Sequence, residues 1–340
     1  MLFRIKDEKA KKLEAQLNKL QKDGPAAWAK LPEDELFTPA GFRSEQAEAT
    51  GYSNYSYWGS TFRAFFKNKL AVVLLVALIA VVAFAFFQPH LPGQVDPNLC
   101  EVDPATGVQY RNIAPGEMGF IWGSNAIGQD LWARIWAGAR TSLIIAFFVA
   151  LIEAVVGITA GVLWGYVRQL DFFFTELYNI INSVPQIIYM TLIALMIGQS
   201  FTIMCVSLIA FHWLVMARNV RNLVMIYRDR EFNLASRTLG TPIYRILVKN
   251  LLPQLVSVII LRLALSIPGT INMETTLSYL GLGLDINTPS LGILLRNARA
   301  YFLDYPYLLI FPAIIVSIIT ITFYLIGNAF SDASDPRNHV

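Results

Sequence analysis

Two charged residues stand inside otherwise apolar stretches of the sequence, and their side chains are the ones most able to do chemistry there. Glu153 lies about midway through the stretch 141–165, and Arg262 lies about midway through 251–271. A charge that faces lipid is costly, so we expect both side chains to face protein or water. Two interpretations stay open: the residues line or brace a path across a membrane, or they form an ion pair with each other or with a second subunit.

Other chemistry-bearing residues form no catalytic arrangement. No Gly-x-x-x-x-Gly-Lys-[Ser/Thr] loop occurs, so ATP is not bound by that device. His90, His212 and His339 are scattered, and no histidine pairs with Ser and Asp in a recognisable nucleophile pattern. Cys100 and Cys205 lie in very different settings, which argues against a disulfide framework or a cysteine metal site. We therefore predict a non-enzyme with no catalytic residue, no metal, no cofactor and no nucleic-acid partner of its own.

The composition indicates that membrane-spanning elements position these residues. Apolar residues make up 55% of the 340 residues and charged residues only 15%, with a mean hydropathy of +0.48. A soluble domain carries about 25% charged residues. The excess apolar surface would have to face lipid, because a soluble monomer does not expose that much.

The apolar stretches predict six membrane-spanning helices. A helix needs about 20 residues to cross the hydrocarbon core. The uncharged stretch 180–212 is 33 residues long, and Gly198-Gln199-Ser200 offers a turn that divides it. The predicted fold class is therefore an all-α integral membrane protein with spans at 70–87, 141–165, 181–197, 201–216, 251–271 and 305–331.

The placement of Lys and Arg predicts the orientation of these spans. Residues 1–69 hold 12 basic residues and residues 218–249 hold seven, whereas 88–130 hold one and 272–304 hold two. Basic segments mark the cytoplasmic side. Both termini are therefore predicted to be cytoplasmic. The first 30 residues carry Leu13, Leu17 and Leu20 on one helical face, and are either a surface helix or a solvated tail.

The basic segment 228–253 predicts two short helices at the cytoplasmic surface. The first runs from Arg230 to about Leu239 and is stopped by Gly240. Pro242 then starts a second helix over 243–250, which runs into the next span. Such a pair forms an exposed docking element, although an ordinary basic loop that obeys the positive-inside rule would have the same composition.

The same segment resembles the coupling motif of type I ABC importer permeases, which is Glu-Ala-Ala, three residues, Gly, nine residues and Ile-x-Leu-Pro. Gly240 and Pro253 stand at the required separation, and Ala235 and Leu252 match. The departures are Leu234 for the glutamate, Ser236 for the second alanine and Asn250 for the isoleucine.

Further stretches resemble the C-type subunit of oligopeptide and dipeptide permeases, particularly the oligopeptide subunits of Gram-positive bacteria. These stretches are Gly123-Ser-Asn-Ala-Ile-Gly-Gln-Asp130, Gly138-Ala-Arg-Thr-Ser-Leu143, the external re-entrant loop at 277–292, the ending Ser331-Asp-Ala-Ser-Asp-Pro-Arg337 and Tyr55-Ser-Tyr-Trp-Gly-Ser60. The resemblance covers residue 52 to the end of the chain.

This resemblance implies a type I ABC importer permease in a bacterial plasma membrane. The chain would pair with a B-type permease, dock two cytoplasmic ATPase subunits that bind ATP and Mg, and receive peptide from an extracellular binding lipoprotein. It implies a cytoplasmic segment 1–69, a first transmembrane helix 70–88, an external loop 89–137, a permease domain 138–332 and a cytoplasmic tail 333–340.

The coupling assignment implies particular roles for residues in the loop. Leu234 removes a carboxylate that often contacts the ATPase, so Arg230, Glu231 and Arg237 become the candidates for polar docking. Polar residues near span ends are candidates to line the path: Asn182, Ser183, Gln186, Asn272 and Thr275. Alternatives stay open, namely the same transporter class with dipeptide, nickel, glutathione or antimicrobial-peptide cargo, a secondary carrier, or a channel subunit.

Overall fold

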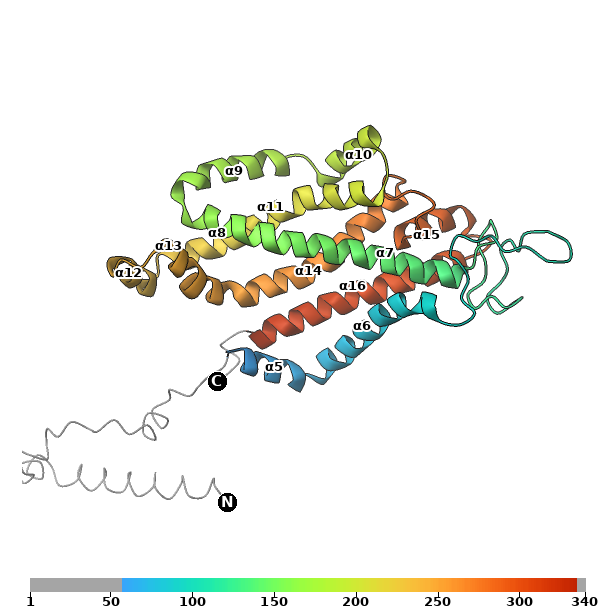
Figure 1. Ribbon diagram of the computed structural model, residues 1–340, viewed down its shortest axis with the longest axis horizontal. Helices are drawn as coiled ribbons and strands as arrows, with labels where there is room; N and C mark the ends of the chain where they lie inside the picture. The colour runs from blue at the N-terminus through green and yellow to red at the C-terminus, as the bar shows by residue number, and fades with distance from the viewer. Residues whose placement is uncertain (1–56, 335–340) are drawn as a thin grey trace, which may run out of the picture. The chain divides into compact units, whose positions relative to one another are not determined.

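Helices make up the regular structure of residues 57–334, the part of the chain that the computed structural model describes (Figure 1). Within this range the only β-type pairing consists of isolated bridges in the loop between the first two long helices. The all-α fold class is therefore confirmed. The region with Leu13, Leu17 and Leu20 lies outside the described residues, as do Tyr55 and the last residues of the C-terminal stretch.

The helices follow one another with short connections, apart from the loops 88–130 and 280–290. The longer ones are α5 (Tyr57–Lys67), α6 (Lys69–Phe87), α7 (Leu131–Ile152), α8 (Ile158–Tyr166), α9 (Arg168–Asn182), α10 (Gln186–Ile197), α11 (Phe201–Arg228), α14 (Leu252–Tyr279) and α16 (Tyr307–Ser334). The shorter ones are α12 (Glu231–Thr238), α13 (Ile243–Arg245) and α15 (Leu291–Ala298). Two π-helical segments, Glu153–Gly157 and Ile246–Leu251, join α7 to α8 and α13 to α14 without a break.

Five described helices are long and apolar enough to cross a membrane, and a sixth crossing requires α9 and α10 to act together. These two helices are bent by 76° relative to each other. The predicted span 181–197 is therefore wrong in its bounds, because the helix breaks after Asn182 and restarts at Gln186. Pro185 explains the break, since proline disfavours helical backbone in the residue before it.

Two further helices extend beyond the predicted spans. α7 begins at Leu131, ten residues before the predicted start at 141, so Arg134 and Arg140 are helical. α14 continues past residue 271 to Tyr279, because no glycine or proline interrupts the chain there. Asn272, Glu274 and Thr275 therefore belong to a helix rather than to an external loop.

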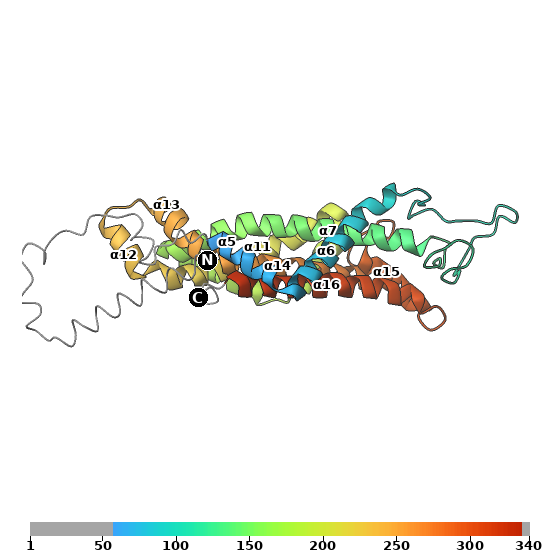
Figure 2. The same cartoon turned by 90° about the horizontal axis from the view of Figure 1, so that it is seen from below.

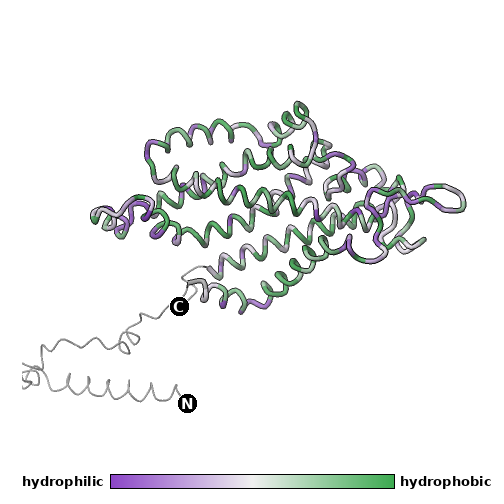
Figure 3. Tube along the Cα trace, in the orientation of Figure 1, coloured by the Kyte–Doolittle hydropathy of each residue, from purple (hydrophilic) through white to green (hydrophobic). Residues whose placement is uncertain are grey.

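The helices pack lengthwise into a bundle with two distinct ends (Figures 1 and 2). We name them by their short helices. The α12 end carries α12 and α13, and the α15 end carries α15 and the loop 88–130. Hydrophobic residues follow the long helices, whereas hydrophilic residues gather at both ends (Figure 3). The largest core cluster joins α6, α7, α14, α15 and α16.

A stripe of glycines allows α8 to lie close against α11. Gly157, Gly161 and Gly165 recur every four residues, so they share one helical face. A Cβ on Gly161 would lie 2.4 Å from the Ala217 carbonyl oxygen, and one on Gly157 would lie 2.7 Å from Met216 Cβ. Close approach through small residues is how helices associate in lipid, where the hydrophobic effect does not drive them together.

Candidate functional site

Gly240 ends α12 and turns the chain toward α13. Its φ of +75° is the left-handed conformation that glycine adopts without a Cβ penalty. The Gly240 amide donates to the Arg237 carbonyl at 2.9 Å, and the Thr241 amide donates to the Ser236 carbonyl at 3.0 Å. This pair of bonds is a Schellman motif, which satisfies the last carbonyls of a helix. The predicted stop at Gly240 is confirmed.

A polar cluster fixes α12 against the π-helical segment that leads into α14. Asn233 is fully buried and donates through Nδ2 to the Tyr227 carbonyl at 2.8 Å. Asn250 Nδ2 donates to Asn233 Oδ1 at 3.3 Å and to Ser236 Oγ at 3.0 Å. Two departures from the coupling motif, Ser236 and Asn250, are therefore partners of each other. In the sequence, Ser236 and Asn250 are two separate departures from the motif. In the structure they form one hydrogen-bonded pair that replaces an alanine and an isoleucine.

The charged residues proposed for docking differ in where they lie. Arg230 and Glu231 are exposed at the start of α12. Arg237 instead points back into the chain: its guanidinium lies 5.0 Å from the centre of the Tyr166 ring and donates to the Arg228 carbonyl at 3.3 Å. Arg237 therefore holds α12 against the end of α8. Only the first two are free to meet a partner across solvent.

Apolar side chains dominate the free surface of α12 and α13. Leu234, which replaces the motif glutamate, is 45% exposed, and Leu239 and Tyr244 are 84% and 72% exposed. Ala235 is exposed beside them, and Pro253 is exposed in the first turn of α14. Exposed apolar residues that gather on one element are typical of surfaces that contact a protein or a membrane.

A cavity of about 380 Å³ lies beneath this surface, and arginines line it. Arg228 and Arg237 both pair with Asp229, at 3.3 and 3.9 Å. Arg228 also donates to the Gly165 carbonyl at 2.9 Å. Arg228 and Arg237 therefore share one acidic partner, Asp229.

Glu153 and Arg262 are not brought together. The Glu153 carboxylate is buried and accepts a hydrogen bond from the Ser266 hydroxyl of α14. Arg262, one turn earlier on α14, is exposed and takes part in none of the ion pairs among the described residues. Glu153 therefore braces the contact between two helices. Its role in lining a path stays a prediction.

A second carboxylate inside the bundle was not predicted. Glu274 is fully buried, and accepts hydrogen bonds from Ser142 Oγ of α7 at 2.9 Å and Ser278 Oγ at 2.8 Å. The Glu153–Ser266 and Ser142–Glu274 contacts join the same two antiparallel helices at two levels. The available signal was the uninterrupted helical sequence after residue 271, which brings Glu274 into α14.

The residues proposed to line a path fall into two groups. Asn182, Ser183 and Gln186 flank the break between α9 and α10, where Ser183 Oγ donates to the Ile180 carbonyl at 2.7 Å. Asn272 is exposed and Thr275 is half-buried on α14. α10 packs against the last turns of α14 through Met190 and Leu277, among others, so both groups lie on neighbouring elements.

The family stretch Gly123–Asp130 builds the entry to α7. Asn125 Oδ1 accepts from the amides of Ile127 and Gln129, at 3.1 and 2.9 Å, which closes a turn. Asp130 is the N-cap, and its carboxylate accepts from the Trp132 amide at 2.9 Å. Burial raises the pKa of Asp130 above its usual range. This stretch therefore positions the first turn of α7.

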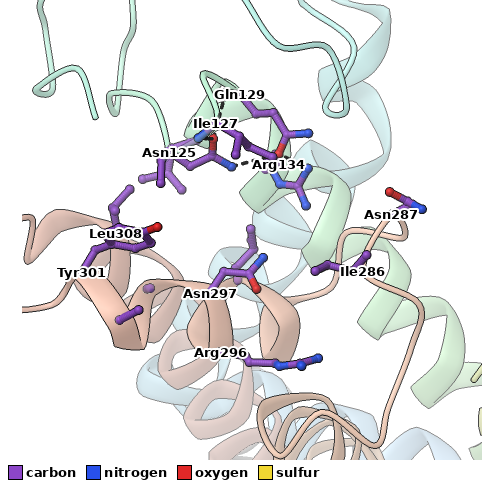
Figure 4. Close-up of a pocket in the computed structure, with 15 residues that line it drawn as sticks. Asn125, Ile127, Gln129, Arg134, Ile286, Asn287, Arg296, Asn297, Tyr301 and Leu308 are labelled. Atoms are coloured by element: carbon purple, nitrogen blue, oxygen red, sulfur yellow. Dashed lines mark hydrogen bonds between the residues drawn. The ribbon is translucent and has the colours of Figure 1, made fainter. Parts of the chain in front are cut away.

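The first turn of α7 and the helix α15 enclose a cavity of about 450 Å³ at the α15 end (Figure 4). Arg134 of α7 and Asn297 of α15 line it, together with Arg296 and Tyr301. None of the residues that line this cavity is an aspartate or glutamate. No part of this cavity was predicted, because its walls come from segments more than 150 residues apart.

An all-helical bundle whose long helices are apolar enough to cross a membrane indicates a multi-pass membrane protein. The family described as "binding-protein-dependent transport system inner membrane component" matches residues 155–340, and the "N-terminal TM domain of oligopeptide transport permease C" matches residues 56–115. The chain belongs to this family of transport permeases and is of the oligopeptide permease C type.

Relatives match nearly the whole chain. The oligopeptide transport system permease protein AmiD of Streptococcus pneumoniae is 35% identical over 88% of this chain and 94% of its own. The dipeptide transport system permease protein DppC of Lactococcus lactis is 33% identical over 88% of this chain and 97% of its own. An inward-facing MetNI methionine ABC transporter structure aligns with 58% of this chain and 94% of its own, at 19% identity and a TM-score of 0.49.

Proposed function

We propose that this chain is the C-type permease of a bacterial ABC importer that carries oligopeptides into the cytoplasm. It would pair with a B-type permease in the plasma membrane, dock two ATPase subunits that bind ATP and Mg, and receive cargo from an extracellular peptide-binding lipoprotein. The α12 end would face the cytoplasm together with both termini, in line with the basic residues near it. Family membership disfavours a secondary carrier or channel.

The observation that carries this proposal is the surface of α12 and α13. Leu234, Leu239 and Tyr244 are exposed on these two short helices, and exposed apolar side chains promote non-specific association unless a partner covers them. The Asn233–Ser236–Asn250 cluster holds this surface in one position, so a partner would meet a preorganised site.

The connection from α13 suggests how a movement of the ATPases would reach the membrane. α13 continues through Ile246–Leu251 directly into α14, with no loop between them. A displacement of α13 would therefore move α14, which carries Ser266 and Glu274 and contacts α7 through both. Small shifts at such an interface are amplified when the packed helices have two arrangements.

Peptide cargo is proposed from the relatives, whose names include both oligopeptide and dipeptide systems. Nickel, glutathione and antimicrobial peptides are the alternative cargoes. These two relatives are similarly identical to this chain but are named for peptides of different length. Peptide length is therefore the property of the cargo to measure. Uptake of a di-, tri- and pentapeptide series by the assembled transporter measures it directly.

A glycine pair in this chain offers a sharp test of the docking surface. Gly240→Asp places a charged side chain on the proposed ATPase-facing turn, where a Cβ meets no other atom within 4 Å. Aspartate tolerates the left-handed conformation, so folding should survive at a cost of about 1 kcal/mol. We expect the variant to insert normally, to lose its ATPase subunits on purification and to take up no peptide.

The matched control is Gly107→Asp, at the other end. Gly107 has a φ of +70° and equally free surroundings. This variant carries the same backbone penalty and the same added charge, and should keep both its ATPase subunits and its uptake. Normal uptake by Gly240→Asp would overturn the docking assignment.

A further inference from the structure

Arg134 carries a buried positive charge that forms no ion pair with a carboxylate of residues 57–334. The residue is 2% exposed, in the first turn of α7. Its Nη1 donates to neutral acceptors only: the carbonyl of Pro97 at 3.1 Å, the side-chain oxygen of Asn98 at 3.2 Å and that of Gln129. Its Nε is buried and has no hydrogen-bond partner among the described residues.

Three partly buried arginines among the described residues show what is missing. Arg221 pairs with Asp171 at 2.6 Å, and Arg228 and Arg237 share Asp229. A buried charge is costly unless it is both paired and hydrogen-bonded. Arg134 has the hydrogen bonds but no anionic partner in the described part of the chain, which points to a negative group supplied by a ligand.

The space for such a group is the cavity that Arg134 lines. Arg134 enters it from α7, and the amide of Asn297 enters it from α15 on the facing side (Figure 4). The side chains of Asn297 and Arg296 take part in none of the ion pairs of the described residues, so their polar groups are available to a ligand. The remaining wall is largely apolar, with Ile127, Ile286 and Leu308.

The volume and chemistry of the cavity identify a class of ligand. About 450 Å³ is within the range of sites for small organic ligands. A guanidinium recognises a carboxylate with two parallel hydrogen bonds, and a side-chain amide can bond to a peptide group whatever the residue beside it. Apolar walls accept a side chain of varied type. These features together suit the end of a peptide chain.

We propose that this cavity binds the C-terminal carboxylate of a peptide, with Arg134 as the anchoring charge, Asn297 as a contact to the terminal peptide group and Arg296 as a second positive charge at the rim. The proposal rests on the proposed function, since peptide would reach the α15 end from the extracellular side. It assigns to the permease a direct recognition of the peptide terminus, before transit through the membrane.

The test compares tri-alanine with tri-alanine amide, which differ only in the terminal charge. Binding of each peptide is measured by saturation-transfer NMR on the purified permease–ATPase complex in phosphatidylcholine nanodiscs, without the external binding protein. We expect the wild-type complex to bind the acid at least tenfold more tightly than the amide. Arg134→Gln should abolish this preference by weakening acid binding alone, as loss of one charge-assisted contact is worth about tenfold or more.

Two other variants keep the test decisive. Arg134→Gln also loses contacts to Pro97 and Asn98, so a second variant is needed in case it does not fold. Asn297→Leu alters the cavity from α15 instead. It should weaken the binding of the acid and of the amide by a similar factor. Arg299→Gln removes a positive charge from the same segment but does not line the cavity, and should leave the preference unchanged.

Each outcome separates this inference from the proposed function. Equal binding of acid and amide to the wild type, or an unchanged preference in Arg134→Gln, overturns the inference. Retention of phosphatidylglycerol that depends on Arg134, without peptide binding, also overturns it in favour of a lipid headgroup. Uptake of tri-alanine by cells that carry the whole transporter tests the proposed function separately, because uptake can be present with or without the acid preference.

Discussion

Both ends of the bundle contain a cavity lined by arginines, but the partners of these arginines differ in charge. At the α12 end, Asp229 pairs with Arg228 and Arg237, and the free surface above is apolar. At the α15 end, Arg134 is buried with neutral partners only, and the cavity stays open to polar ligands. Internal pairing suits a surface that binds another protein through shape and apolar area. A buried arginine that has only neutral partners suits a site that binds an anion.

This contrast also shows in how each end is held. The α12 end is fixed by the Asn233–Ser236–Asn250 cluster, which is partly buried between α12 and the π-helical segment Ile246–Leu251. The α15 end is tied to the interior by Glu274, whose carboxylate joins α14 to α7. Removing either polar centre should loosen one end and leave the other in place, so variants can separate the two.

The largest effect is expected for Glu274→Ala. The change leaves the hydroxyls of Ser142 and Ser278 without their acceptor and opens a cavity in a fully enclosed place, which together cost about 2–4 kcal/mol of unfolding free energy. Thermal unfolding in detergent should show the loss, and amide hydrogen exchange should rise in α15 but not in α12.

Glu274→Gln is the matched control, because its carbonyl oxygen can still accept a hydrogen bond and its size is unchanged. It should retain most of the stability. If both variants unfold alike, the charge rather than the hydrogen bonding holds the helices. If exchange rises equally at both ends, the proposed separation of the two ends is wrong.

An intermediate effect is expected at the α12 end for Asn250→Ile. This variant restores the residue of the coupling motif but leaves Asn233 Oδ1 buried without its donor, at a cost of about 1–2 kcal/mol. Hydrogen exchange in α12 should increase, while the α15 end is unaffected. The variant should also lower ATP-dependent uptake, because the docking surface is no longer held in one position.

The partner substitution Ser236→Ala tests the coupling of the two departures. Because Asn250 Nδ2 donates to Ser236 Oγ at 3.0 Å, the double variant should be more stable than the sum of the two single changes by about 0.5–1 kcal/mol. Additive behaviour would show that the pair does not act as a unit.

The sequence was sufficient for the features that depend on local patterns. The helical class, the short helices around Gly240 and the run into the following span all follow from apolar length and helix stop signals. The break at Pro185 was available as a local signal too. The predicted span 181–197 ignored it because apolar length was weighed above the effect of proline on the preceding residue.

Features that depend on which way a side chain faces could not be predicted in the same way. Counting residues placed Glu153 and Arg262 at similar depth, but only packing shows that Glu153 meets Ser266 while Arg262 is exposed. Ser236 and Asn250 are 14 residues apart, and in the sequence each is only a departure from the coupling motif. The fold brings them within hydrogen-bond distance of each other. The cavity at the α15 end joins segments with no sequence signal in common.

The smallest expected effect concerns the charge balance at the α15 end. Burial raises the pKa of Asp130 above its ordinary value of 3.8, and burial together with Asp130 raises that of Glu101. A raised pKa in the folded state means that the stabilising contribution is complete below the unfolded pKa. It is lost as pH rises through the folded value. Ionised Asp130 therefore lowers the free energy of unfolding at neutral pH. An aspartate that formed an ion pair with Arg134 would not lower it.

Asp130→Asn tests this directly, because asparagine keeps the side-chain oxygen that accepts from the Trp132 amide and is an equally good N-cap. Relative to wild type, the variant should be more stable at neutral pH, and this advantage should shrink as pH falls through the folded pKa of Asp130 and vanish below the unfolded pKa. Thermal unfolding at both pH values measures the difference, which we expect to be smaller than either effect above. A variant that is instead less stable at neutral pH would show that Asp130 neutralises Arg134, and the contrast between the two ends of the bundle would disappear.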